Sequence, residues 1–177
     1  YIKDGLPYCS KCNTPRFARL DANTVVRCIC ECQEEQDKLE TELKARQIKY
    51  DAIIESVKKT GLFIQEETCS FMNTDLIRDQ TFVSAFNRSK RYAGIYEKAL
   101  SEGYGIYYYG ESGVGKTHLM RCIKNYLDKL YIPMLIVTEQ DIDNAVKATY
   151  STDHTAQELI QKLSTIEFLG IDDLMTK

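Results

Sequence analysis

A glycine-rich loop at residues 110–117 holds the most recognisable chemistry in this sequence, and it reads Gly-Glu-Ser-Gly-Val-Gly-Lys-Thr. Its glycines allow backbone angles and a close approach to an anion that a Cβ would prevent. Lys116 is placed to reach the β- and γ-phosphates of a nucleotide, and the hydroxyl of Thr117 can bind Mg²⁺. The residues predicted to contact the nucleotide are Gly110, Glu111, Ser112, Gly113, Val114, Gly115, Lys116, Thr117 and His118.

The segments on either side of this loop match the setting that phosphate binding needs. An apolar run at 105–109 predicts a buried strand before the loop, and a helical pattern follows it at 119–130. A strand would then deliver the loop to a helix N-terminus, where unpaired N–H groups and the helix dipole favour a polyphosphate. A chance glycine-rich turn is the weaker interpretation, because all four fixed positions of the motif are matched.

Two carboxylates, Asp172 and Asp173, follow the apolar run 168–171, about 55 residues after the loop. At the carboxyl end of a parallel strand, Asp172 can hold Mg²⁺ together with Thr117. Asp173 is placed to orient or deprotonate the attacking water. The predicted catalytic residues are therefore Lys116, Asp172 and Asp173, and the predicted magnesium ligands are Thr117 and Asp172.

Five of the seven cysteines fall close together near the N-terminus: Cys9, Cys12, Cys28, Cys30 and Cys32. Two thiolates three residues apart can chelate one ion, and a second pair farther along can complete a tetrahedron. No histidine lies nearby, so four sulfur ligands and Zn²⁺ are predicted. The sequence leaves open which one of Cys28, Cys30 and Cys32 is not a ligand. A redox pair, unrelated buried thiols and an iron–sulfur cluster are the alternatives.

The composition limits the class of protein. A length of 177 residues suits one ordinary domain plus a small module, and 44% hydrophobic and 28% charged residues are typical of a soluble globular chain. A net charge of −3 argues against a strongly cationic protein that binds DNA without specificity. No apolar run approaches the length of a membrane span. The odd, clustered set of cysteines indicates a reducing cytoplasm, and the start at Tyr1 leads us to expect missing N-terminal sequence.

The remaining elements follow from periodicity. A strand at 133–138, helices at 141–150 and 155–164, and a strand at 167–173 alternate after the loop. This alternation predicts an α/β fold with parallel strands and right-handed crossovers. An amphipathic helix is predicted over 75–100, and its basic residues near Arg88 form either a solvated face or a DNA-binding surface.

A highly charged stretch predicts one long helix from about 33 to 60, ended by Gly61. This helix is either a solvated connector or a surface for a partner protein. The predicted domains are a zinc-binding module at 1–34, a charged linker helix at 35–66 and a P-loop ATPase core at 67–177.

Taken together, these motifs resemble the bacterial and phage replicative-helicase loaders of the DnaC/DnaI type, which are AAA+ ATPases. The resemblance covers nearly the whole chain and includes the segment Thr68-Cys69-Ser70-Phe71 before the ATPase. It implies ATP, Mg²⁺ and Zn²⁺ as cofactors, an N-terminal zinc module that contacts the hexameric replicative helicase, and side-by-side self-association of the AAA+ module. Single-stranded DNA is a further partner that the resemblance implies.

Two departures from the family pattern change these expectations. AAA+ proteins usually have Glu where Asp173 stands, so slow hydrolysis or a binding switch is expected. The chain stops at Lys177, before the family's next strand with its polar sensor and before the arginine finger. That strand would lie between the loop strand and the Asp172 strand, so a truncated ATPase core is expected. A non-hydrolysing adaptor or inhibitor of a replication protein, and a transposase-helper ATPase, are the alternative functions.

Overall fold

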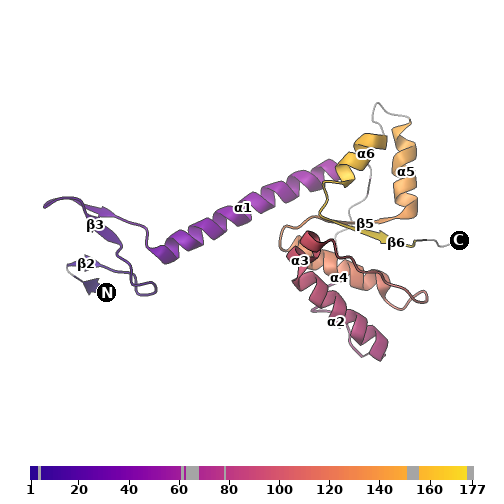
Figure 1. Ribbon diagram of the computed structural model, residues 1–177, viewed down its shortest axis with the longest axis horizontal. Coiled ribbons are helices and arrows are strands. Elements are labelled where there is room, and N and C mark those ends of the chain that lie inside the picture. The colour runs from indigo at the N-terminus through magenta and orange to yellow at the C-terminus, as the bar shows by residue number, and fades with distance from the viewer. Residues whose placement is uncertain (4, 61, 63–67, 78, 151–155, 175–177) are drawn as a thin grey trace. The chain divides into compact units, whose positions relative to one another are not determined.

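The computed structural model describes residues 1–3, 5–60, 62, 68–77, 79–150 and 156–174, and it divides into two compact units (Figure 1). The first unit is Tyr1–Gln47 and the second is Ile48–Lys177, so the division falls within the longest helix. The predicted domain limits at 34 and 66 fall on either side of this division and stay predictions. In the described part of the chain, no helix is both long enough and apolar enough to cross a membrane.

The first unit contains two small antiparallel ribbons and most of a long helix. Its elements are β1 (Ile2–Lys3), β2 (Leu6–Pro7), β3 (Phe17–Arg19), β4 (Val25–Arg27) and the first part of α1 (Glu31–Lys58). The β3–β4 turn is held by Asp21, whose carboxylate accepts from the backbone N–H of Asn23 at 2.9 Å and of Thr24 at 2.8 Å. The buried residues that the structure describes before α1 are Cys9 and Cys30. The cysteines therefore occupy the place where a larger domain would have an apolar core.

Helix α1 follows the charge pattern of the sequence and begins two residues earlier than that pattern predicted. Glu31 and Glu34 lie in its first turn, where they favour the positive end of the helix dipole. Exposed ion pairs one turn apart, such as Lys38–Glu34 at 2.7 Å, give it weak, solvent-screened support. Burial increases only toward its C-terminal end, where Val57 is 1% exposed.

The second unit is a helix–strand–helix arrangement around a parallel strand pair. Its elements are α2 (Gln80–Gly94), α3 (Tyr96–Glu102), α4 (Lys116–Asp128), β5 (Met134–Thr138), α5 (Glu139–Thr149), α6 (Ala156–Leu163) and β6 (Phe168–Asp172). Strand β5 pairs with β6 in parallel, from Met134 opposite Phe168 to Thr138 opposite Asp172. This pairing agrees with the predicted α/β alternation, and it brings the C-terminal end of β6 level with the C-terminal end of β5.

Alternate residues of β5 pack into different apolar clusters because successive strand side chains point to opposite faces. Met134 packs with Met120, Ile123 and Leu127 of α4. Leu135 and Val137 pack in the other cluster, which contains residues of α5 and α6 and the buried end of α1. The phosphate-loop helix and the end of the linker helix are therefore both parts of the second unit's core.

The predicted helix over 75–100 is wrong in extent, because the structure has two helices there. Helix α2 begins after Asp79, whose carboxylate caps the helix by accepting from the N–H of Phe82 at 2.8 Å. Ile95 has φ −111° and separates α2 from α3. The N-cap carboxylate therefore sets where the first helix begins, and the nonhelical Ile95 divides one amphipathic pattern into two elements.

The predicted strand over 105–109 is also not a strand in the structure. Tyr107 and Tyr109 are exposed and stack at 6.4 Å between ring centroids, whereas Tyr108 is inward-facing, with its hydroxyl 2.6 Å from Ser89 Oγ. A strand requires a hydrogen-bonding neighbour, and β6 pairs only with β5 among the described strands. The expectation that a further strand lies between 105–109 and β6 stays a prediction.

A buried charged network joins the C-terminal end of α4 to α1. Lys124 is 3% exposed and forms an ion pair with Asp128, one turn later. The other oxygen of Asp128 accepts from the Tyr50 hydroxyl at 2.9 Å. Burial, followed by the charge of Asp128, raises the pKa of Tyr50. The network fixes α1 against the end of the phosphate-loop helix.

We predict that Asp128→Ala will destabilise this unit, because it leaves the Lys124 ammonium buried without a counter-charge. Removing one partner of a buried ion pair costs about 3–5 kcal/mol, and the partial exposure of Asp128 reduces our expectation to roughly 2–3 kcal/mol. Urea unfolding followed by circular dichroism measures this change. Asp143→Ala is the matched control, since its exposed pair with Lys147 has the same one-turn spacing and should contribute about 0.5 kcal/mol or less. Equal losses in both variants would contradict the role of burial.

Candidate functional site

The phosphate loop has the backbone geometry that its glycines allow. Gly113 has φ +81° and Gly115 has φ +102°, both in the left-handed region that side chains disfavour. Gly115 is the N-cap of α4, and no side chain in the described structure caps this helix end. The first N–H groups of α4 consequently face the loop, which is the arrangement that attracts an anion.

Lys116 is folded back over the loop. Its Nζ donates to the carbonyl of Gly110 at 2.9 Å and to the carbonyl of Glu111 at 2.8 Å. These contacts hold the ammonium group against the start of the glycine-rich loop. The Lys116 ammonium and the glycine-rich backbone therefore lie together at the N-terminal end of α4.

Thr117 and the end of β6 meet directly. The Thr117 hydroxyl donates to Asp172 Oδ1 at 3.1 Å, across 55 residues of sequence. A hydroxyl and a carboxylate at this separation are oxygen ligands of the kind that Mg²⁺ prefers. Parallel pairing explains the contact, because β6 ends beside the N-terminal turn of α4.

Asp173 lies at the turn after β6. Its φ of +50° is unusual for a residue with a side chain, although Asp tolerates this region better than most. Its backbone N–H donates to Asp172 Oδ1 at 3.1 Å. The chain thus turns directly after Asp172, and Asp173 stands next to it at the strand end.

The His118 side chain is part of a cluster that sequence reasoning did not find. Its Nε2 lies 2.8 Å from Thr74 Oγ1 and 3.5 Å from Cys122 Sγ. Thr74 belongs to the segment after Thr68-Cys69-Ser70-Phe71, so this ring contacts that segment rather than the loop's glycines. His118 was predicted to contact the nucleotide, and that contact stays a prediction. No spacing in the sequence signals the contact with Thr74.

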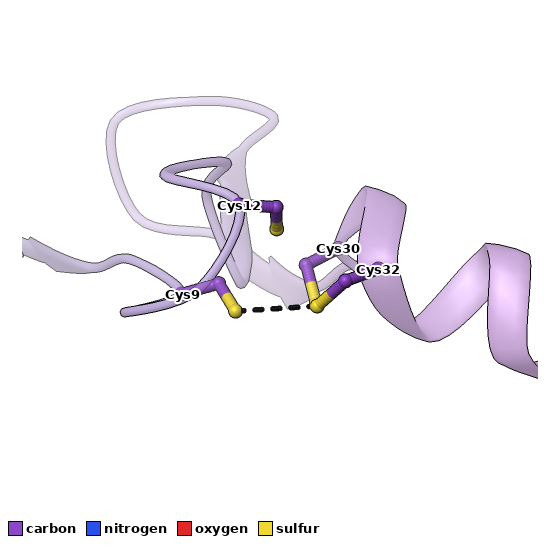
Figure 2. Close-up of side chains that lie close together, drawn as sticks. All are labelled: Cys9, Cys12, Cys30 and Cys32. Atoms are coloured by element: carbon purple, nitrogen blue, oxygen red, sulfur yellow. Dashed lines mark hydrogen bonds between the residues drawn. The ribbon is translucent and has the colours of Figure 1, made fainter.

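The structure gathers four of the five N-terminal cysteines. The Sγ atoms of Cys9, Cys12, Cys30 and Cys32 all lie within 4.8 Å of one another (Figure 2). The Cys9–Cys32 and Cys30–Cys32 sulfur separations are 3.5 and 3.4 Å. Cys28 is outside this group, and its thiol lies 3.9 Å from the carbonyl of Val26.

The backbone explains why Cys28 is separate. Strand β4 ends at Arg27, and α1 begins at Glu31, so the three later cysteines do not share one extended strand. Cys30 precedes the helix and Cys32 lies in its first turn. The turn before α1 and the first turn of the helix bring the thiols of Cys30 and Cys32 to the Cys9–Cys12 pair, whereas the thiol of Cys28 lies near the carbonyl of Val26.

Thr14 is a second residue that motif spacing did not identify. Its hydroxyl lies 3.0 Å from Cys12 Sγ and accepts from the N–H of Glu31 at 3.2 Å, which ties the knuckle to the start of α1. The Thr14 hydroxyl, followed by the Cys32 backbone, lowers the pKa of Cys12 to about 6. Contacts with Cys30 and then Cys9 raise the pKa of Cys32 to about 12. Metal binding at these thiols would release their protons, because the thiolate is the ligand.

The four sulfur atoms fit a tetrahedral zinc ion. A Zn–S bond of about 2.3 Å places tetrahedral sulfur ligands about 3.8 Å apart. The observed separations, from 3.4 Å up to the 4.8 Å limit, bracket this value. Soft thiolates without oxygen or nitrogen ligands favour Zn²⁺ over hard cations. Cys9, Cys12, Cys30 and Cys32 are therefore the residues that could hold zinc.

Comparison with known proteins identifies replication proteins. Residues 80–176 match the family model of the bacterial DnaA ATPase domain. The replicative helicase loader DnaC of Buchnera aphidicola (subsp. Acyrthosiphon pisum) is 29% identical over 143 residues, 80% of this chain and 56% of that protein. DnaC of Escherichia coli K12 is 25% identical over 143 residues, 80% of this chain and 57% of that protein.

A shorter match points to the same group of proteins. The chromosomal replication initiator protein DnaA of Tropheryma whipplei is 37% identical over 71 residues, 39% of this chain and 15% of that protein. The chain thus spans little more than half the length of the DnaC proteins that it matches.

We predict that Cys30→Ser will strongly weaken zinc binding, whereas Cys28→Ser will not. Changes to groups that only orient a metal ligand cost about 10–100-fold in affinity, so loss of a ligand should cost more. Metal analysis of reduced, gel-filtered protein, with a competing chelator to rank affinities, measures the effect. Equal zinc retention in both variants, or equal loss, would contradict the ligand set.

Proposed function

Because the chain belongs to the family of the bacterial DnaA ATPase domain and the DnaC-type helicase loaders, we propose that it is an ATP-dependent loader of the replicative helicase. ATP and Mg²⁺ bind at the phosphate loop, and the N-terminal cysteine module binds the hexameric helicase. The nucleotide state then controls the transfer of the helicase to single-stranded DNA. Side-by-side association of the AAA+ modules belongs to the same proposal.

The contact between Thr117 and Asp172 is the observation that carries this proposal. A phosphate loop alone could serve many reactions, but its threonine here meets a strand-end carboxylate at 3.1 Å. Thr117 and Asp172 would hold Mg²⁺, and the ion would neutralise the charge that develops on the β- and γ-phosphates. Lys116 would exchange its contacts with the carbonyls of Gly110 and Glu111 for phosphate oxygens.

Asp173 would orient or deprotonate the attacking water from its position beside Asp172. Its side chain is one methylene shorter than the Glu usual in AAA+ proteins, so we expect slow turnover that a partner stimulates. The left-handed backbone at Asp173 sets the direction in which this short side chain leaves the strand end.

A non-hydrolysing adaptor is the second candidate function, and the short Asp173 side chain is the observation that favours it. In that case ATP would bind and act only as a conformational switch that captures or inhibits a replication protein. Measurements of ATP binding and ATP turnover distinguish the two functions, because the adaptor would bind ATP without hydrolysing it, whereas the loader would do both.

We predict that Lys116→Ala will weaken Mg²⁺–ATP binding by at least about tenfold, since a charge-assisted contact to phosphate is lost. Equilibrium titration with a fluorescent ATP analogue measures binding, and phosphate release with and without helicase and single-stranded DNA measures turnover. Lys147→Ala is the control, because Lys147 is an exposed lysine on α5. Unchanged nucleotide affinity in Lys116→Ala would contradict the proposed site. Binding without turnover under every condition would favour the adaptor.

A further inference from the structure

The first turn of α4 has to keep its position without a side-chain cap. It begins after Gly115, and no side chain in the described structure caps this helix end. A cap would occupy N–H groups that a phosphate needs, whereas an uncapped helix end tends to fray because those groups stay unpaired. Contacts from the side of the helix must therefore hold Lys116 and Thr117 in place.

Three consecutive side chains of this turn make such contacts. The Thr117 hydroxyl donates to Asp172 Oδ1 at 3.1 Å. Leu119 is 2% exposed and packs in the apolar cluster that α4 shares with α2. Between them, His118 Nε2 lies 2.8 Å from Thr74 Oγ1. An ion bound by Thr117 and Asp172 would replace their direct hydrogen bond, whereas the contact between His118 and Thr74 would remain.

The direction of the hydrogen bond between His118 and Thr74 follows from the second contact of the hydroxyl. Thr74 Oγ1 donates to the carbonyl of Ser70 at 2.8 Å. A hydroxyl has one hydrogen to donate and lone pairs that accept, so it accepts from the Nε2–H group of His118. The buried thiol of Cys122 lies 3.5 Å from the same nitrogen and 3.6 Å from the hydroxyl. This side of the contact therefore faces the protein interior.

The segment that contains Thr74 is itself held at several points. The Asn73 side chain accepts from the backbone N–H of Ser70 at 2.8 Å and donates to the carbonyl of Thr68 at 3.0 Å. The Phe71 ring packs against both apolar clusters that α2 and α4 share. A ring bonded to this segment is therefore bonded to the core of the second unit.

We propose that His118 is a positioning residue for Mg²⁺. Through Thr74 it holds the first turn of α4, and it thereby keeps the hydroxyl of Thr117 where Thr117 and Asp172 can share the ion. The inference rests on the proposed function, which assigns Mg²⁺–ATP to the phosphate loop. Oxygen ligands of Mg²⁺ lie about 2.0–2.1 Å from the ion in near-octahedral geometry, so a small displacement of the hydroxyl weakens binding.

The test is a titration of Mg²⁺ at a fixed concentration of a fluorescent ATP analogue, with the complete zinc-loaded chain and no chelator. Thr74→Val and His118→Leu remove the hydrogen bond, whereas Thr74→Ser keeps the hydroxyl and His118→Gln keeps a donor. Loss of one hydrogen bond should raise the Mg²⁺ concentration for half-maximal binding roughly three- to tenfold. Saturating Mg²⁺ should restore nucleotide binding. The two conservative variants keep the bond and should change this concentration by less than about twofold.

Thr149→Val on α5 is the matched control. Thr149 is also half-buried, and its hydroxyl donates to the backbone carbonyl of Val146 at 2.7 Å. This variant should lose a similar amount of stability in urea unfolding without a change in Mg²⁺ dependence. The double variant Thr74→Val with His118→Leu should bind no more weakly than either single variant, because both changes remove the same contact.

The imidazole N–H proton gives a second measurement on the nucleotide-free chain. A proton held between His118 and Thr74 should exchange slowly with water and give a ring N–H resonance by NMR. The chain has two histidines, so loss of the signal in His118→Leu assigns it. The signal should also disappear in Thr74→Val, and its persistence there would overturn the proposed contact.

The outcomes separate the positioning role from the proposed function. Failure of the wild-type chain to bind Mg²⁺–ATP would overturn both. If the wild type binds, the positioning role alone is wrong when the disruptive variants keep the normal Mg²⁺ dependence, lose affinity equally at all Mg²⁺ concentrations, or match Thr149→Val. If Thr74→Val does not fold, His118→Leu and His118→Gln decide, and equal shifts in these two would contradict the role of the Nε2–H donor.

Discussion

The contact between the Thr117 hydroxyl and Asp172 determines how the second unit is organised for chemistry. It requires that α4 start beside the C-terminal end of β6, and this in turn requires the parallel register of β5 and β6. Gly170 shows how close this packing is, because a Cβ there would lie 2.7 Å from Met120 Sδ. Strand and helix approach closely because glycine leaves room for the methionine of α4.

Helix α4 also connects the phosphate loop to helix α1. Its N-terminus follows the phosphate loop, and near its C-terminal end Asp128 pairs with Lys124 and accepts from the hydroxyl of Tyr50 on α1. A displacement of α4 on nucleotide binding would therefore also move the C-terminal part of α1, which belongs to the same compact unit. Buried polar contacts of this kind fix one geometry, because an unpaired charge in the core is costly.

The two units are stabilised by different physical means. The second has apolar clusters on both faces of its strand pair. Residues 1–30 have few buried apolar side chains, and their buried positions are cysteines. Metal coordination can supply about 10–16 kcal/mol of apparent folding free energy to such a segment. Its apolar side chains can then remain at the surface, where they are available to a partner.

Local sequence spacing determined the phosphate loop and the Cys9–Cys12 knuckle, because each depends on backbone geometry over a few residues. The alternation of strand and helix patterns predicted the parallel strands, because such alternation favours crossover connections. Only the tertiary structure decided that Cys28 is separate from the sulfur cluster, since the turn between β4 and α1 orients the later thiols. The same holds for the contact of His118 with Thr74, and for the unpaired segment at 105–109. The spacing of residues predicts the local backbone structure of neighbouring residues, whereas contacts between distant side chains depend on how whole helices and strands pack.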